Sequence, residues 1–341
     1  MEKYLKTMNL NNIIKPGFYN TNICESINKK FVGQEDVCNK LFDIITRHKM
    51  DVGSNSFSYF SSRAVILDGA IGTGKTAMIK EITQKLDIPC VNWNINYGIS
   101  INFNEILTYL YKIAKGNLEK AECGIVVLDQ FEKVLYNPKD LRWTDKIDLQ
   151  LEILNYLNGG KYKILVEDLS HKKIEIEFDT SRLMFIYNSD LLKIKNSKEN
   201  VDELLADDEN QVSLDDFKQM GLEKAFLLRI HPNDCLHTKK YSKEDLFNIL
   251  TKSTISPMLK FDTWIKSIGK SLVVEDGVYE RIASIAFEMG NGARSLEFLI
   301  HKIEMYMIYK DSLFFKKSEI NLNLDVLDEI YKNDFGGKRM K

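Results

Sequence analysis

A glycine-rich segment, Gly69-Ala70-Ile71-Gly72-Thr73-Gly74-Lys75-Thr76, matches the phosphate-binding pattern G-x-x-x-x-G-K-[ST]. It follows a short apolar run and opens a helical pattern, which is the context that this motif requires. Glycines let backbone N–H groups close around phosphate oxygens, and a helix N-terminus adds a favourable partial charge. The Lys75 ammonium can neutralise the β- and γ-phosphates, and the Thr76 hydroxyl can hold Mg²⁺. The segment therefore predicts a nucleotide site; the alternative is a glycine-rich turn that matches by chance.

A second element of the expected site is an apolar run at 124–128 that is followed by Asp129. This run predicts a buried strand that ends in an acidic residue. Its carboxylate fits the group that holds Mg²⁺ through water, although an Asp at a strand end can also cap the next helix. No N-K-x-D guanine signature occurs, because residues 137–140 have the order N-P-K-D. The sequence therefore favours ATP over GTP.

Gln130 occupies the position at which many ATPases carry a Glu that polarises the attacking water. A Gln side chain can hydrogen-bond that water but cannot accept its proton, so binding should survive while hydrolysis slows. Either the protein is naturally a slow ATPase, or a Glu→Gln change was introduced to trap bound ATP.

The elements that must position these residues alternate along the first two thirds of the chain. Short apolar runs predict strands, and helical periodicity predicts helices near 105–114 and 149–157; this alternation is typical of an α/β fold with a parallel sheet and helices on both faces. The runs lie at 64–67, 88–92, 124–128 and 183–187. Residues 162–178 break the rhythm and predict a projecting hairpin.

From about Lys239 onward the pattern is mainly helical. Ser242 and Asp245 predict a capping box at a helix start. Helices are expected near 255–268, 277–289 and 293–309, with a short strand near 320–324. We therefore expect an arm at 1–30, a large α/β domain at 31–238 and a small helical lid at 239–341.

Composition excludes several classes of protein. The 341 residues are 44% apolar and 28% charged, which rules out a collagen-like or wholly disordered chain. No run is long enough for a membrane span, and the first residues lack the pattern of a secretory signal. The 47 basic and 49 acidic residues nearly cancel, which argues against a surface for duplex nucleic acid. Five scattered cysteines without a C-x-x-C pair indicate reduced thiols in a cytoplasmic protein.

Five ordered motifs resemble the AAA+ superfamily and, within it, the ClpX-type protein unfoldases, over the chain from about Phe31 to about Lys310. They are FVGQED at 31–36, GIVVLDQFEK at 124–133 (similar to GIVYIDEIDK), DTSRLMFI at 179–186 (similar to DTSKILFI), GLEKAFLLR at 221–229 (similar to GLIPEFIGR) and GARSL at 292–296 (similar to GARGL).

The resemblance implies a role for several single residues. Val32 and Gly33 would line the adenine pocket, and Asn188 would act as the first sensor. Arg229 falls on the arginine finger, which a neighbouring subunit supplies to the γ-phosphate, and Arg294 falls on the second sensor, which acts in cis. From their residue types alone, both arginines could instead form ordinary ion pairs, and Asn188 could satisfy a loop backbone.

Features for handling substrate are also implied by the resemblance. Tyr97 and Gly98 stand where the family has the GYVG loop that grips polypeptide, although Tyr97 could simply cover the domain edge. The hairpin tip at 171–173 resembles a basic second pore loop, or is a solvated turn. The family's four-Cys zinc domain is not expected, and residues 191–220 contain no Gly for the ClpP-docking tripeptide, so partnership with ClpP is not expected.

The resemblance thus implies an AAA+ P-loop NTPase core with a helical lid, binding ATP and Mg²⁺ in a homo-oligomeric ring, most simply a hexamer, that remodels a protein partner. One rival is a ring in which bound ATP only stabilises a scaffold and Gln130 is native. Another is a nucleic-acid-directed AAA+ regulator, such as a loader or transposition regulator, which the nearly neutral charge disfavours.

Overall fold

The computed structural model describes residues 21–53, 63–96, 101–135, 143–167, 173–191, 213–310 and 318–334. The chain divides into two compact units. The first comprises residues 1–27, 36–69 and 75–238, and the second comprises residues 28–35, 70–74 and 239–341.

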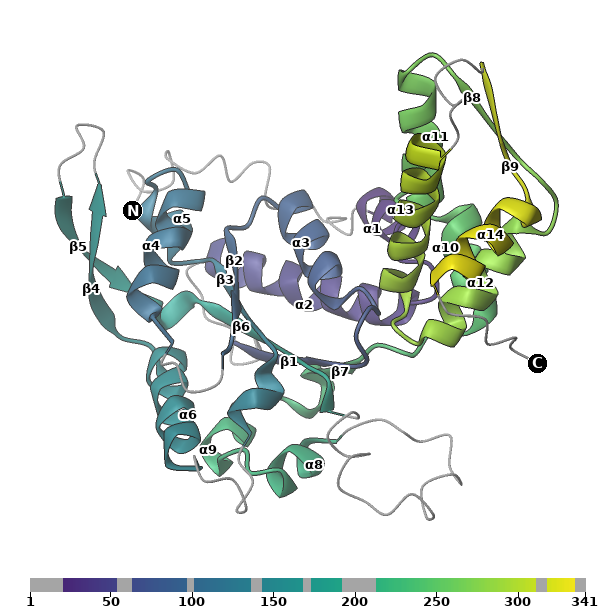
Figure 1. Ribbon diagram of the computed structural model, residues 1–341. Coiled ribbons are helices and arrows are strands. Elements are labelled where there is room, and N and C mark those ends of the chain that lie inside the picture. Colours follow the sequence, from purple (N-terminus) through teal and green to yellow (C-terminus); the bar gives the residue numbers. More distant parts are fainter. Residues whose placement is uncertain are drawn as a thin grey trace. The chain divides into compact units, whose positions relative to one another are not determined.

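The first unit is built around a five-stranded parallel sheet, which confirms the predicted α/β class (Figure 1). The strand order is β2 (Cys90–Asn94), β3 (Ile125–Asp129), β6 (Met184–Ser189), β1 (Ala64–Asp68) and β7 (Cys235–His237). In this register Leu67 lies opposite Asn188 and Asp68 lies opposite both Ser189 and His237. The polar residues that end these strands therefore lie close together at the carboxyl-terminal end of the sheet.

Helices cover both faces of this sheet, as expected for parallel strands that are buried on both sides. Figure 1 shows α2 and α3 on one side and α6, α8 and α9 on the other. The helical elements are α1 (Thr21–Asn28), α2 (Glu35–Gly53), α3 (Lys75–Lys85), α4 (Phe103–Ile113), α5 (Leu118–Ala121), α6 (Trp143–Asn158), α8 (Leu214–Gln219) and α9 (Lys224–Leu227), with short 3₁₀ turns η2 (Phe131–Val134), η3 (Thr180–Arg182) and η4 (Pro232–Asp234).

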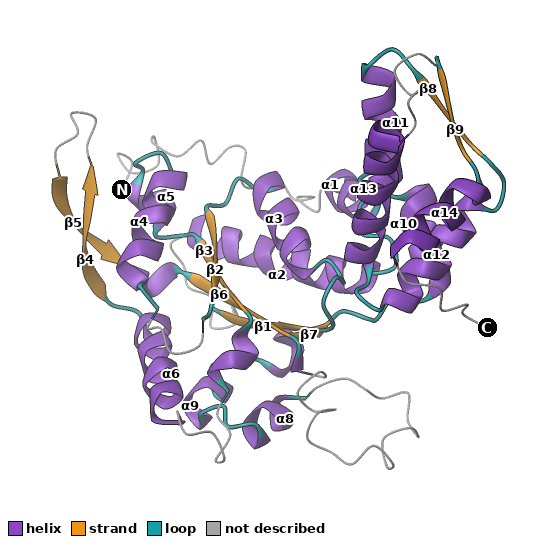
Figure 2. Ribbon diagram, viewed as in Figure 1, coloured by secondary structure: helices purple, strands orange, loops and turns teal. Residues whose placement is uncertain are grey.

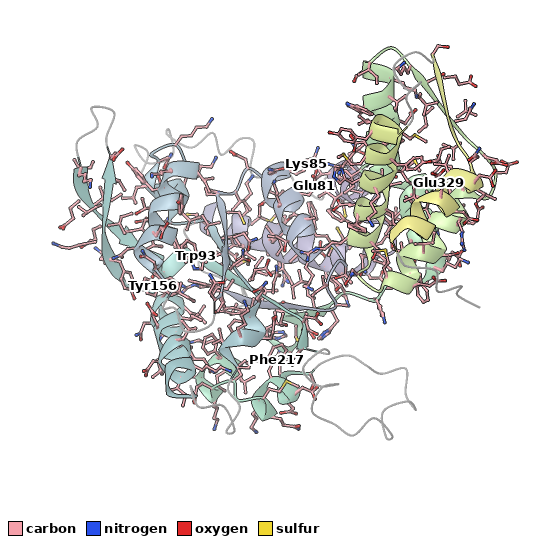
Figure 3. The ribbon with its side chains drawn as sticks, in the orientation of Figure 1. Glu81, Lys85, Trp93, Tyr156, Phe217 and Glu329 are labelled. Atoms are coloured by element: carbon pink, nitrogen blue, oxygen red, sulfur yellow. The ribbon has the colours of Figure 1, made fainter. Side chains whose placement is uncertain are left out.

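The predicted hairpin is present as β4 (Lys161–Glu167) and β5 (Lys173–Asp179), which pair antiparallel (Figure 2). Its base is held by a stack of three aromatic rings. Tyr156, labelled in Figure 3, stacks on Phe103 at 3.9 Å and on Tyr162 at 4.2 Å between ring centroids. Such stacks stabilise beyond their buried area, so the hairpin is anchored to α4 and α6.

The second unit is mainly helical, with a core that includes Leu246, Ile282, Leu296 and Leu327. Its elements are α10 (Lys243–Lys252), α11 (Pro257–Ser267), α12 (Val278–Met289), α13 (Ala293–Lys310), α14 (Leu324–Asp334) and the parallel pair β8 (Ser271–Val274) and β9 (Glu319–Leu322). The capping box of Ser242 and Asp245 is formed as predicted. Among the residues that the structure describes, none of the helices combines the length and apolar character needed to cross a membrane.

Candidate nucleotide-binding site

Three polar side chains of the first unit meet at the N-terminus of α3. The Thr76 hydroxyl donates to Asp129 Oδ2 at 3.3 Å and accepts from Asn188 Nδ2 at 3.3 Å. Thr76 is the second residue of α3, Asp129 ends β3 and Asn188 lies near the end of β6. The fold thus brings together Thr76 and Asn188, which are 112 positions apart in the sequence. Asn188 is 1% exposed, and its Oδ1 has no hydrogen-bond partner among the described residues. This side chain therefore has a free acceptor at the site.

Lys75 lies beside these groups, at the first position of α3. Its ammonium donates to the Gly69 carbonyl oxygen. Burial lowers the pKa of Lys75, and the carboxylates of Asp190, Asp68, Asp129 and Glu132 oppose that effect. These carboxylates favour the charged form of Lys75, and a cation at the N-terminus of a helix is suited to bind an anionic ligand.

Gln130 follows Asp129 in a left-handed backbone conformation, with φ of 62°. Its Oε1 accepts from Lys133 Nζ, which also donates to the Ile95 carbonyl at 2.8 Å. The side chain is exposed, and its amide offers no carboxylate base. Glu132, two residues on, accepts from Asp190 N at 3.3 Å, and burial raises the pKa of its carboxyl group.

The middle of the phosphate loop, residues 70–74, belongs to the second unit and is held there by backbone contacts. Ala293 N donates to the Gly72 carbonyl at 3.0 Å, and the Tyr241 hydroxyl donates to the Thr73 carbonyl at 3.1 Å. Gly72 has φ of 80°, and a Cβ there would lie 1.9 Å from the Asn291 carbonyl oxygen. Glycine is required at this position for both reasons.

A small hollow opens next to this part of the loop, within the second unit. Most of its walls are aromatic, aliphatic and glycine residues, together with Thr73 and Lys240; the others are Ala70, Ile71, Tyr241, Leu246, Ala286, Phe287, Gly290 and Gly292. Val32 packs against the core of the same unit, and Gly33 N donates to Glu35 Oε1 at 2.8 Å. The volume of the hollow, about 20 Å³, is close to the space that one water molecule needs, so the hollow does not enclose an organic ring.

The two predicted arginines are both exposed. Arg294 is the second residue of α13 and follows Ala293, whose N–H binds the phosphate loop. Arg229 follows α9, where its Nε donates to Asn158 Oδ1 at 2.7 Å and its Nη1 donates to the Ala225 carbonyl at 2.6 Å. Tyr97, Gly98 and the hairpin-tip residues 171–172 lie outside the described residues.

The oxygens at the site fit Mg²⁺. A hydroxyl and a carboxylate lie side by side at Thr76 and Asp129, and Mg²⁺ prefers oxygen ligands. Within the described ranges, no group of three or more His, Cys, Asp or Glu could hold a metal ion without other ligands. Mg²⁺ usually takes one or two protein ligands and completes its shell with water and phosphate.

Two residues of the site were not identified from the sequence. Asp68 contacts the segment after Asn188, and Tyr241 holds the phosphate loop. Asp68 directly precedes the motif, so an acid at the end of an apolar run was the available signal. Tyr241 gave no signal, because its position beside Thr73 depends on the fold.

No protein-family model matches the chain. The chain is similar to curated proteins named "ATP-dependent Clp protease ATP-binding subunit ClpX". It is 22% identical to that of Treponema denticola over 289 residues, which cover 76% of this chain and 68% of that protein. It is 24% identical to that of Bacteroides thetaiotaomicron over 350 aligned positions, covering 93% and 82%. For the ClpX 3 protein of Methylococcus capsulatus the values are 22%, 74% and 64%. These similarities confirm the resemblance to ClpX-type AAA+ proteins that the motifs predict.

Proposed function

We propose that this chain is a ClpX-like AAA+ ATPase that binds ATP with Mg²⁺ and uses it to remodel or unfold a protein partner. The proposal rests on the hydrogen bonds that join Thr76, the last residue of the phosphate-loop motif, to Asp129 and Asn188 at the N-terminus of α3. This arrangement is suited to phosphoryl transfer, in which positioning and electrostatic stabilisation supply most of the catalysis.

The phosphate groups are bound by the backbone of residues 69–74 and by Lys75. Thr76 and Asp129 hold Mg²⁺, which neutralises charge developing on the phosphate oxygens when it is bound. Val32 and Gly33 contribute to the base pocket. Asn188 orients the attacking water through its free Oδ1, and Arg294 reaches the γ-phosphate in cis.

The active form that we propose is a ring, most simply a hexamer. Arg229 is exposed and would be supplied to the nucleotide of a neighbouring subunit. Tyr97 and Gly98 would contact the polypeptide in the pore. We also propose that the ring works without ClpP, because residues 191–220 contain no Gly for a docking tripeptide. In this proposal residues 31–238 form the nucleotide-binding domain, residues 239–341 form the lid and residues 1–30 form an arm.

A test of this proposal is to restore the missing carboxylate with Gln130→Glu. General-base loss typically costs about 10²–10⁴-fold in rate, so phosphate release should be very slow in the parent and at least roughly tenfold faster in the variant. The neighbouring Lys133 ammonium would keep the new carboxylate ionised. Gln130→Ala is the matched control and should stay slow. Solution mass with and without ATP·Mg²⁺ should be measured in parallel.

One observation favours the second candidate, an ATP-binding ring that does not hydrolyse. The Gln130 side chain is engaged by Lys133, as a structural residue would be. If Gln130→Glu binds ATP and assembles but its turnover stays at background, the scaffold function replaces the ATPase function.

A further inference from the structure

Asp68 is a buried carboxylate directly ahead of the first glycine of the phosphate loop. It ends β1, which lies between β6 and β7, and is 1% exposed. One oxygen, Oδ1, accepts from the Ser189 hydroxyl at 2.5 Å and from Leu191 N at 2.9 Å. Asp68 therefore holds the chain immediately after Asn188.

The same two segments are also joined in the opposite direction. Gly69 N donates to the Ser189 carbonyl at 3.1 Å. Three hydrogen bonds thus connect residues 68–69 with residues 189–191, which directly follow Asn188, the partner of Thr76. A shift of the end of β6 would break this set and move Asn188 away from Thr76.

Burying a carboxylate such as that of Asp68 costs free energy unless hydrogen bonds or nearby charges compensate for the lost contact with water. Its second oxygen, Oδ2, has no hydrogen-bond partner among the described residues and lies 3.8 Å from His237 Nδ1. The direct hydrogen bonds to this carboxylate are those of the two donors on Oδ1, and the nearby Lys75 ammonium adds a favourable Coulomb interaction. Charge-assisted hydrogen bonds are roughly twice as strong as neutral ones, so the carboxylate fixes these two donors more firmly than a neutral acceptor would.

We propose that Asp68 is a positioning residue that keeps Asn188 aligned with Thr76 and Asp129 during ATP hydrolysis. The proposal rests on the ATPase function proposed above. Asn188 acts on the attacking water, whereas the loop backbone and Lys75 bind the phosphates. Loss of the Asp68 contacts should therefore lower kcat and leave the affinity for ATP nearly unchanged, which identifies an interaction needed only in the transition state.

The test compares Asp68→Leu with Asp68→Asn in the Gln130→Glu background. Leucine removes both contacts, and kcat should fall at least about tenfold while the Kd for ATP changes less than about threefold. Asparagine keeps an acceptor oxygen for Ser189 and Leu191, and should recover most of the lost rate. Amide hydrogen exchange at Leu191, measured without nucleotide, should be faster in Asp68→Leu and close to the parent in Asp68→Asn.

Thr180→Val is the matched control, because it removes a buried hydroxyl group in the turn η3, which precedes β6. The Thr180 hydroxyl accepts from Gly160 N at 3.1 Å and donates to the Tyr156 carbonyl at 3.2 Å. This variant should lose stability but keep its kcat. The proposal is wrong if Asp68→Leu keeps its kcat, if ATP binding is lost together with kcat, or if Asp68→Asn is as slow as Asp68→Leu. If the Gln130→Glu parent itself is inactive, the ATPase function fails, and exchange at Leu191 still decides whether Asp68 holds this segment.

Discussion

Lys75 is the residue on which nucleotide affinity should depend most. Its ammonium is partly buried, and nearby carboxylates interact with it. In the proposed site this ammonium binds the phosphate groups of ATP. A charge-assisted contact is worth about 1.5–3 kcal/mol, and Lys75→Ala should weaken ATP affinity at least roughly tenfold, or about 1.4 kcal/mol. Isothermal calorimetry measures this directly. Lys85→Ala at the other end of α3 (Figure 3) is the control and should bind normally; equal affinity for Lys75→Ala would exclude Lys75 from the site.

Tyr187 shows the cost of a buried hydroxyl. Its side chain is fully buried in β6, and its hydroxyl has no hydrogen-bond partner among the described residues. An unsatisfied polar group costs about 1–3 kcal/mol, whereas the ring contact with Phe131, 4.5 Å between centroids, needs no hydroxyl. Tyr187→Phe should therefore raise the free energy of unfolding by about 1 kcal/mol in urea titrations. Tyr241→Phe, which removes a made hydrogen bond, should lower it. A less stable Tyr187→Phe protein would mean that the hydroxyl has a partner.

At the scale of elements, α2 carries a group that makes stability depend on pH. His48 is 4% exposed, its Nε2 lies 3.1 Å from the Cys123 carbonyl, and burial lowers its pKa to about 4. The unfolded chain, with a His pKa near 6.5, binds a proton more readily than the folded one. Stability should therefore be full above about pH 6.5 and fall as the pH drops toward about 4, by about 3 kcal/mol in total.

This contribution can be isolated with His48→Gln, which keeps an N–H donor but does not titrate. Urea unfolding at pH 7.5 and 4.5 should show a smaller loss of stability in the variant than in the parent. The acidic groups common to both proteins cancel in that difference. The same loss in both proteins would show that His48 does not carry the effect.

Elements whose signals are local were predicted correctly from the sequence. The helix start at Ser242 depends on two residues three positions apart, and the hairpin of β4 and β5 depends on adjacent segments. The strands β7 and β8 were not predicted. β7 has only three residues, and β7 and β8 are each defined by a partner far away in the sequence. β9 (Glu319–Leu322), the partner of β8, was predicted although it also has four residues.

The candidate site divides in the same way. Lys75, Thr76 and Asp129 stand in motifs whose chemistry is readable at fixed spacing. The contacts of Asp68 with Ser189 and Leu191 cross more than a hundred residues, and only the register of β1 with β6 brings them together. The sequence shows an acid at the end of an apolar run, but long-range pairing of this kind leaves no trace in local spacing, so the partners of Asp68 could not be predicted.

At the scale of the whole molecule, the proposed ring makes catalysis depend on a residue from another subunit. Arg229 is exposed and is bound within its own chain only to Asn158 and the Ala225 carbonyl in the part of the chain that the structure describes. A cation from a neighbour stabilises the charge of phosphoryl transfer only when subunits assemble. In the Gln130→Glu background, Arg229→Ala should therefore abolish most turnover while each subunit still binds ATP. Lys224→Ala, at an exposed residue of the preceding helix α9, should keep turnover.

Mixing two inactive variants tests the direction in which Arg229 is supplied. An Arg229→Ala subunit keeps its phosphate site, and a Lys75→Ala subunit keeps its arginine. In a mixed ring the first can hydrolyse ATP only when the second lies beside it on the side that presents Arg229. Phosphate release should therefore be partly recovered in mixtures and absent from either protein alone. If mixed rings form, shown by native mass spectrometry, and no activity returns, Arg229 is not the arginine finger. If the protein stays monomeric with and without ATP·Mg²⁺ at every concentration, the ring itself is excluded, because no neighbour exists to supply the charge.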